Sequence, residues 1–321
     1  MKPLKMKNIG RELGVLIALL VMILIFTLID RAYFTAGNMV DIVKQATING
    51  ILAIGITFAI ISGGIDLSIG CTFAIVIVAV GQFTVMGFVP AAAILFGAVV
   101  GAVLGSINGI LITKMHLQPF IATLGTMSIY RGFAYVVTGG WPVLGIPDSY
   151  RRALGAKIIG DIPVSILVLA AIALITHILL QKTRFGNYLF AVGGNEEAAK
   201  LSGVNVDLTK IIAYLICGVC AAFAGMIMLA NLGTGEPASG QGYELDAIAA
   251  SAIGGTRMAG GRGSIVGTLL GALLLAALKI GLIITGVSTF WQFIVTGIII
   301  IIAAYFEIIQ AKISVMMSRK A

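Results

Sequence analysis

Charged side chains are scarce in this sequence. They make up 11% of the 321 residues, whereas hydrophobic residues make up 59%. A soluble globular domain carries roughly 25% charged residues, so the composition excludes an ordinary water-soluble fold. It predicts an integral membrane protein that sits in a lipid bilayer. The net charge of +8 then reflects lysine and arginine gathered in cytoplasmic loops, and no nucleic-acid partner is expected.

The residues that carry most enzyme chemistry are also few. The two histidines, His116 and His177, belong to no H-E-x-x-H sequence, and G-x-S-x-G does not occur. The three cysteines, Cys71, Cys217 and Cys220, lie in apolar segments without a second pair or a nearby histidine. This pattern indicates small buried residues rather than a zinc or redox site. We therefore expect no enzyme: no catalytic residues, no metal and no cofactor.

Sequences that bind nucleotide phosphates are absent. Neither G-x-G-x-x-G nor G-x-x-x-x-G-K-[S/T] is present in the chain. The glycine-rich stretch 254–267, GGTRMAGGRGSIVG, has two interpretations, a phosphate-binding loop or a tight cytoplasmic turn, and its spacing favours the turn. If transport by this chain is driven by ATP, the nucleotide must therefore bind to another protein.

Acidic residues are the scarcest charges, with 13 Asp and Glu against 21 Lys and Arg. All of them lie at or near the ends of the predicted membrane spans, although Asp66 and Asp246 are borderline. A carrier coupled to protons or sodium ions usually keeps a carboxylate at mid-depth in the membrane. The distribution therefore disfavours secondary transport.

Apolar runs divide the chain into about ten transmembrane helices, since a spanning helix needs roughly 20 mostly apolar residues. The first run follows a basic segment, as in a signal peptide, but no small-x-small cleavage site comes after it, so we expect a retained helix. The segment from Leu245 is too short to span unless it is extended or broken. The predicted spans are 13–29, 43–61, 67–87, 89–113, 119–137, 163–180, 211–232, 245–254, 266–285 and 290–306.

The distribution of Lys and Arg predicts the orientation of these helices. With the N-terminus inside, 14 of the 21 basic residues fall in interior segments and four in exterior ones, as the positive-inside rule requires. We therefore expect one all-α transmembrane domain over 1–321 with both termini in the cytoplasm. Its cytoplasmic loop is 181–210, and its main exterior loops are 138–162 and 233–244.

The cytoplasmic loop contains a short capped helix. Asn195 is a suitable N-cap residue, the two glutamates that follow favour the first turn, and Gly203 stands where a C-cap glycine is expected. So short a helix needs external contacts to be stable. It is either part of a solvated linker or a docking helix for a cytoplasmic protein. The candidate contact residues are Asn195, Glu196, Glu197, Ala198, Ala199, Leu201, Ser202 and Gly203.

Four stretches together resemble the ribose-type permeases of bacterial ABC importers. They are Gly64–Gly70 (GIDLSIG), Gly193–Gly203, Gly242–Ala250 (GYELDAIAA) and the glycine loop with Gly254-Gly255-Thr256 and Gly260–Gly263. The resemblance covers nearly the whole chain, but the loop at 256–259 departs from it with Arg257, to which we assign no role. It implies that residues 195–203 form the coupling helix.

The same resemblance implies the partners and the location of the protein. The partners are a cytoplasmic ABC ATPase, an extracytoplasmic sugar-binding protein and a second permease subunit, expected to be a copy of this chain. The location is the bacterial inner membrane, which the chain crosses several times. The cargo is a monosaccharide such as ribose, although members of this family also carry other pentoses, hexoses, inositol or a furanose signal molecule.

A sugar path should be lined by neutral hydrogen-bonding groups and some apolar surface. Polar residues in spans also hold helices together, so each candidate below either lines the path or connects helices. Arg131 is a separate case, which either extends to the membrane surface or pairs with a carboxylate. The path candidates are Asn49, Thr57, Phe58, Ser62, Asp66, Asn108, Phe120, Thr123 and Tyr130. Glu236, Tyr243 and Glu244 are the candidates for docking the binding protein.

A passive channel or a secondary carrier for a small polar solute is the principal alternative, and a membrane enzyme is a distant third.

Overall fold

Helices account for nearly all of the regular structure. The computed structural model describes residues 3–159, 162–288, 290–299, 301–302 and 305. Its elements are α1 (Pro3–Ile29), η1 (Arg31–Phe34), α2 (Ala36–Ile61), α3 (Ile69–Val85), α4 (Pro90–Thr113), α5 (Pro119–Thr138), α6 (Asp148–Gly155), β1 (Lys157–Ile159), β2 (Ile162–Pro163), α7 (Val164–Lys182), α8 (Arg184–Gly194), α9 (Glu196–Leu201), α10 (Val206–Leu232), α11 (Tyr243–Ile253) and α12 (Ile265–Ile284), followed by a helix over Phe290–Ile299. The strands β1 and β2 form a small antiparallel hairpin, which the all-α prediction did not include.

A described helix lies at each of the ten predicted spans. Seven of the described helices, α1, α2, α4, α5, α7, α10 and α12, are long and apolar enough to cross a membrane on their own. Helix α3 and the helix over Phe290–Ile299 are apolar but shorter. Helix α11 has 11 residues, in agreement with the expectation that the segment from Leu245 is too short to span. The end of the last predicted span and the predicted inner tail after Glu307 lie outside the described residues.

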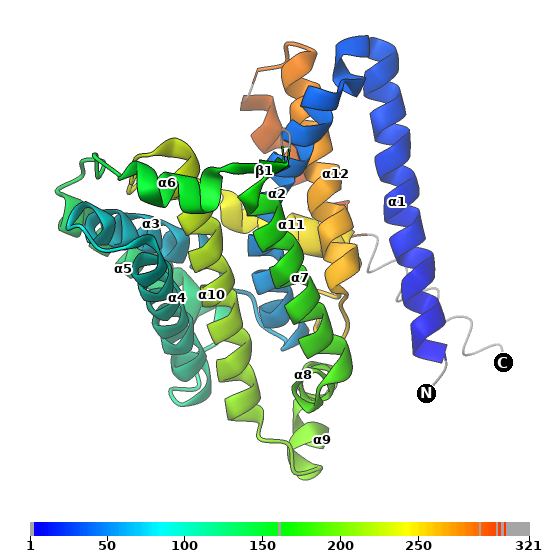
Figure 1. Cartoon of the computed structure of the whole chain (residues 1–321). Helices are drawn as coiled ribbons and strands as arrows, with labels where there is room; N and C mark the ends of the chain where they lie inside the picture. The colour runs from blue at the N-terminus through cyan, green and yellow to red at the C-terminus, as the bar shows by residue number, and fades with distance from the viewer. Residues whose placement is uncertain (1–2, 160–161, 289, 300, 303–304, 306–321) are drawn as a thin grey trace.

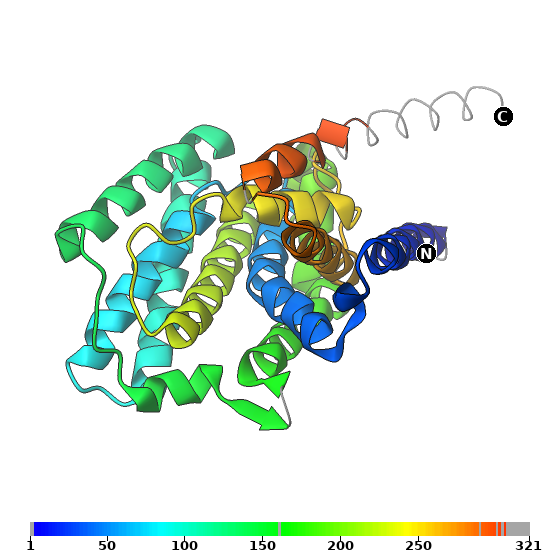
Figure 2. The ribbon, with the colours of Figure 1, turned by 90° about the horizontal axis from the view of Figure 1, so that it is seen from above.

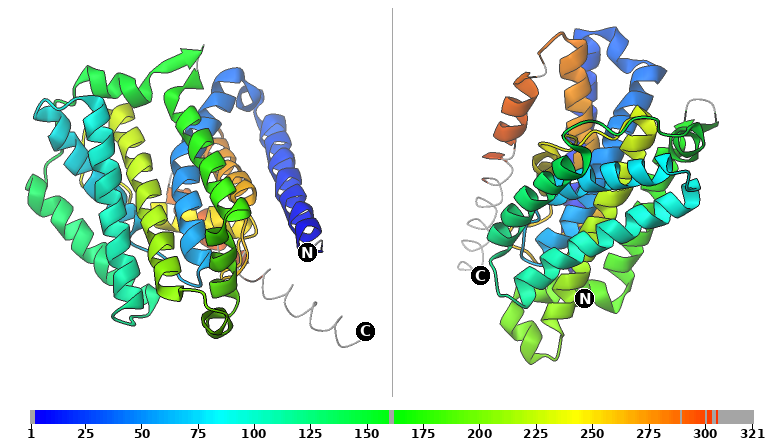
Figure 3. Two further views of the ribbon diagram at one scale, coloured as in Figure 1. Left: turned by 60° about the horizontal axis from the view of Figure 1, so that its bottom comes forward. Right: turned by 90° about the vertical axis from the view of Figure 1, so that its left-hand side faces the viewer.

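The two ends of the bundle carry different elements (Figure 1). Helix α6, the hairpin and η1 lie at one end, which we call the α6 end. Helices α8 and α9 and the start of α1 lie at the other, which we call the α9 end. The views in Figure 3 show α8 and α9 beyond the ends of α7 and α10. Helix α9, which contains the short capped helix predicted from the sequence, therefore projects from one end of the bundle.

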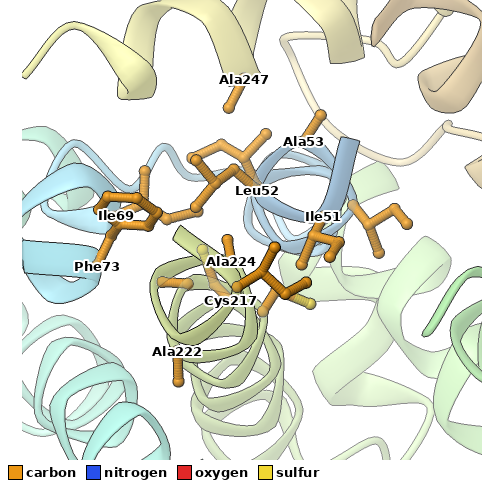
Figure 4. Packing of buried hydrophobic residues seen from close by; sticks show 14 of the residues in the cluster. Ile51, Leu52, Ala53, Ile69, Phe73, Cys217, Ala222, Ala224 and Ala247 are labelled. Atoms are coloured by element: carbon orange, nitrogen blue, oxygen red, sulfur yellow. The ribbon is translucent and has the colours of Figure 1, made fainter. Parts of the chain in front are cut away.

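Helix α2 forms the centre of the bundle. It packs against α10, α12, α11 and α7, and Figure 4 shows Leu52 and its neighbours on α2 between Phe73 of α3, Cys217 of α10 and Ala247 of α11. Helix α1, in contrast, lies at the edge beside α12 (Figure 2). Tyr33 in η1, which follows α1, connects this region to the bundle. Its hydroxyl donates to the carbonyl oxygen of Ala277 on α12 at 2.9 Å.

Glycine allows the helices to approach closely. On α4, the residues Gly97, Gly101, Gly105 and Gly109 recur every four positions and face α10. A Cβ atom on Gly105 would lie 2.2 Å from the carbonyl oxygen of Tyr214, so no larger residue fits without moving a backbone. Small residues at such intervals let membrane helices touch backbone to backbone. Next to Gly109 on this helix is Asn108, which belongs to the polar network described below.

Candidate functional site

Helix α9 forms as its sequence predicts. The Asn195 side chain accepts a hydrogen bond from the backbone N–H of Ala198 at 3.0 Å, which satisfies one of the donors left free in the first turn. Gly203 follows the helix with φ of 83°, a left-handed conformation that glycine adopts without strain. Both ends of the predicted helix are thus confirmed by the structure.

Helix α8 precedes α9 and was not predicted. Thr183 caps its start, accepting from the N–H of Gly186 at 3.3 Å, and Gly186, Leu189 and Val192 form its buried side. The spacing of these three residues, with Thr183 before them, is the sequence signal that could have revealed the helix. The 181–210 loop is therefore two consecutive helices that meet at Asn195, rather than one helix in a linker.

The side chains of α9 divide into an inner and an outer set. Ala199 is buried against Val192 of α8 and Val206 of α10, so it holds α9 on its own chain. The other coupling candidates are exposed, and Leu201 has 89% of its surface accessible. Glu196 forms an ion pair with Lys210 of α10 at 2.6 Å. Ala198, Leu201 and Ser202 are therefore open to contact by another molecule.

Three turns meet where α9 joins the bundle. The carbonyl oxygen of Ile61, at the end of α2, accepts from the backbone N–H of Gly261 at 3.0 Å. A Cβ atom on Gly193 would lie 1.7 Å from the same oxygen, and one on Gly260 would lie 3.0 Å from the Cα atom of Gly63. We call Ile61, Gly63, Gly193, Gly260 and Gly261 the glycine junction. Backbones in direct contact have little freedom to slide, so the end of α8, which leads into α9, is held directly against the end of α2.

The glycine-rich stretch forms part of this junction. Arg257 donates its backbone N–H to the carbonyl oxygen of Arg262 at 3.0 Å, which closes the loop as a turn. Gly260 and Gly261 both have positive φ angles, 86° and 74°, which only glycine adopts readily. The loop is therefore the tight turn that the spacing favoured.

A buried polar network lies between the α2–α3 connection and helices α4 and α5. The Asp66 carboxylate accepts from the hydroxyl of Ser68 at 2.7 Å and from its N–H at 2.9 Å. Asn108 donates its amide to the Ser68 hydroxyl and accepts from the Thr126 hydroxyl, both at 2.7 Å. Burial raises the pKa of the Asp66 carboxyl above its usual range, and the Ser68 hydrogen bonds oppose that shift.

This network brings together three of the path candidates. Asp66 and Asn108 belong to it directly, and Thr123 joins from α5 by donating to the carbonyl oxygen of Ile65 at 3.1 Å. A second cluster forms around Thr57, whose hydroxyl lies 2.9 Å from that of Ser251 on α11 and 2.8 Å from that of Thr268 on α12. Both groups connect different helices, as buried polar residues in membranes commonly do.

The remaining path candidates are dispersed. Phe58 stacks on Phe185 of α8, Ser62 donates to the carbonyl oxygen of Ala59, and the Tyr130 hydroxyl donates to that of Leu104. Phe120 is exposed on the outside of α5. Asn49 lines a cavity near the α6 end. The nine residues thus fall into separate groups within the described structure, and their role in a path stays a prediction.

The docking candidates lie in or beside the connection from α10 to α11. Tyr243 packs edge-on against Phe73, and Glu244 accepts from the backbone N–H of Gly242 at 3.2 Å. Both therefore help to hold the connection in place, and all three candidates are half-buried. Arg131 fixes the same connection from α5, since its guanidinium donates to the carbonyl oxygens of Pro237 and Ser239 at 2.7 and 2.8 Å. The docking role of the three candidates stays a prediction.

Comparison with known proteins shows what this chain is similar to. Residues 38–304 match the family described as "Branched-chain amino acid transport system / permease component". The ribose import permease protein RbsC of Bacillus subtilis (strain 168) is 41% identical over 307 residues, which are 95% of each chain. The RbsC protein of Escherichia coli (strain K12) is 42% identical over 294 residues, 90% of this chain and 91% of the relative. The D-allose transport system permease protein AlsC of the same strain is 35% identical over 313 residues, 97% and 96% of the two chains. No solved structure matches.

Proposed function

The chain belongs to the family of permease components described for branched-chain amino acid transport systems, and we propose that it forms the membrane path of an ATP-driven importer for a monosaccharide. The observation that carries this proposal is 41% identity to a ribose import permease over 95% of both chains. Relatives named for allose, xylose and galactose support a sugar as the class of cargo. Ribose is the first member of that class to test.

The energy for import comes from a separate ATPase that docks on α9. The support is geometric: Ala198, Leu201 and Ser202 are exposed on a capped helix, and the glycine junction connects that helix to the end of α2. An extracytoplasmic binding protein delivers the sugar to the opposite, α6 end. In this proposal, two copies of the chain form the path between them, which agrees with the dispersal of the path candidates within one chain.

The α9 end faces the cytoplasm, and the chain crosses the membrane ten times with both termini inside. The excess of Lys and Arg in the predicted inner segments supports this orientation. The start of α1 and helix α9 lie at the same end of the bundle (Figure 1), as the orientation requires. Three of the ten helices, α3, α11 and the one over Phe290–Ile299, are short for a full crossing. They cross with the support of neighbouring helices.

Uptake by proteoliposomes tests the function. The vesicles contain this chain with its ATPase, ATP is supplied on the ATPase side, and the sugar-binding protein with radiolabelled D-ribose is supplied on the other. We expect uptake that requires ATP and stops when the ATPase is replaced by a hydrolysis-deficient form. Equal uptake without ATP would contradict the proposal and favour a passive channel, and uptake driven by an ion gradient alone would favour a secondary carrier.

A further inference from the structure

A cavity of about 380 Å³ opens near the α6 end. Residues of α2, α10, α11, α12 and the helix over Phe290–Ile299 line it. Sites for small molecules typically have volumes of roughly 300–1,000 Å³, so the cavity is large enough for one small solute. It lies within a single chain and is separate from the Asp66 network, none of whose residues line it.

Amide side chains dominate the chemistry of this cavity. Gln45, Asn49, Asn231 and Gln292 line it, and each amide offers both a donor and an acceptor. Asn49 is only 2% exposed, yet its amide nitrogen has no hydrogen-bond partner, and the amide nitrogen of Gln292 is also buried without one. Since buried polar groups are nearly always satisfied, these two donors are available to a molecule that occupies the cavity.

The charges around the cavity cancel. Lys279 lines it and forms an ion pair with Asp246, and Lys44 pairs with Asp41 at 2.9 Å, with both of those residues also on the lining. A charged solute would have to compete with one of these pairs. Neutral solutes that donate and accept at several points fit the lining better, and the ring of Tyr243 supplies a flat apolar surface.

The lining residues also define a depth. Gln45 and Asn231 are exposed at the opening, whereas Asn49 lies one helical turn further along α2 and is buried. A solute that enters between the two exposed amides would meet the free donor of Asn49 at the bottom. The arrangement thus orders its polar groups along a single entry direction.

We propose that this cavity binds one neutral polyhydroxylated molecule of monosaccharide size, within a single subunit and without help from the partners. The choice of a sugar as the first probe rests on the proposed function. Hydroxyl groups of the solute accept from Asn49 and Gln292 and donate to the amide oxygens at the opening. The cavity then holds sugar at the end of the bundle where the binding protein releases it.

Equilibrium binding of D-ribose to the purified full chain in lipid nanodiscs tests the proposal. We expect saturable binding by the wild-type chain and at least tenfold weaker binding by Asn49→Leu, which keeps the size of the side chain but removes its donor. Gln292→Leu, on a different helix, should weaken binding in the same way. Gln82→Leu on α3 removes an amide away from the cavity and should bind as the wild type does. Size-exclusion profiles confirm that each variant is folded.

The outcomes separate this site from the transport function. Absence of saturable binding by the wild type up to about 10 mM D-ribose, or equal binding by both cavity variants, would overturn the site, and the cavity would then hold only water. ATP-driven uptake in the reconstituted system would stand in that case. Conversely, binding that is lost in Asn49→Leu, together with uptake that never depends on ATP, would support the site and refute the importer.

Discussion

Replacing Gly193 by alanine is expected to reduce ATP-driven sugar uptake at least tenfold while the ATPase remains bound. The added Cβ atom would lie 1.7 Å from the carbonyl oxygen of Ile61 and 2.6 Å from the backbone nitrogen of Gly261. These two atoms are hydrogen-bonded to each other, so neither can retreat without opening the glycine junction. Overpacking of this kind costs roughly 1–3 kcal/mol, and we expect it to be relieved by separation of the end of α8, which leads into α9, from the end of α2.

The neighbouring glycine provides a matched control. A Cβ atom on Gly194 would meet nothing within 4 Å, so Gly194→Ala makes the same chemical change one residue away without a clash. Uptake and ATP hydrolysis are measured in parallel for both variants. The expected result is a Gly193→Ala complex that hydrolyses ATP with little transport, and a Gly194→Ala complex that works as the wild type does. Normal transport by Gly193→Ala would show that the junction does not transmit movement.

Replacing Lys279 by methionine is expected to produce the largest loss of stability. Lys279 and Asp246 form an ion pair between α12 and α11, with 15% and 8% of their side chains exposed. Removing one member of a buried pair leaves the other charge unpaired and costs about 3–5 kcal/mol. We expect the lower part of this range, because the pair borders a cavity and Lys279 keeps some exposure.

The double variant Lys279→Met with Asp246→Leu separates charge from packing. An apolar pair of similar volume commonly replaces a buried ion pair without loss, so the double variant should recover most of the stability. Lys44→Met serves as the control, since it breaks an exposed pair with Asp41 and should cost less than about 1 kcal/mol. The measurement is the midpoint of thermal unfolding of the purified chain in detergent. Equal midpoints for the wild type and Lys279→Met would contradict the assignment.

Local patterns in the sequence predicted helices well. The capped α9 followed from Asn195 and Gly203 alone, because capping depends on neighbours within a few residues. Each of the ten predicted spans corresponds to a described helix, because length and apolar composition are also local properties. Helix α8 was not predicted, because only one short side of it is apolar and buried against the protein. The polar residues on its other sides made this apolar pattern hard to recognise in the sequence.

Burial within the bundle could not be predicted from hydrophobicity. Among the seven long helices, α1 is the most apolar and has 11% of its apolar window buried, whereas the central α2 is much less apolar and has 83% buried. A helix surface that contacts lipid must be apolar, whereas a helix surface buried inside a membrane protein can carry small and polar residues such as Thr57. In this setting the most hydrophobic helix marks the edge of the bundle, not its centre.

The partners of isolated charges also required the structure. Arg131 binds carbonyl oxygens that lie 106 and 108 residues further along the chain, and Lys279 pairs with a carboxylate 33 residues before it. Nothing in the neighbouring sequence indicates either contact. The cavity near the α6 end could not be predicted from neighbouring sequence either, because four elements and the helix over Phe290–Ile299 contribute to it. Only Asn49 among its lining residues was a path candidate.

Energy for transport enters this chain at α9 in the proposed mechanism. Photo-cross-linking in the assembled transporter tests it most directly, with a benzophenone side chain placed at position 198 on α9 or, as a control, at position 149 on α6. Ala198 and Ser149 are both exposed, so either position can carry the label without disturbing the core. The account predicts that the ATPase is cross-linked from position 198 and not from position 149. Cross-linking of the ATPase from position 149 alone would contradict both the orientation of the chain and the role of α9.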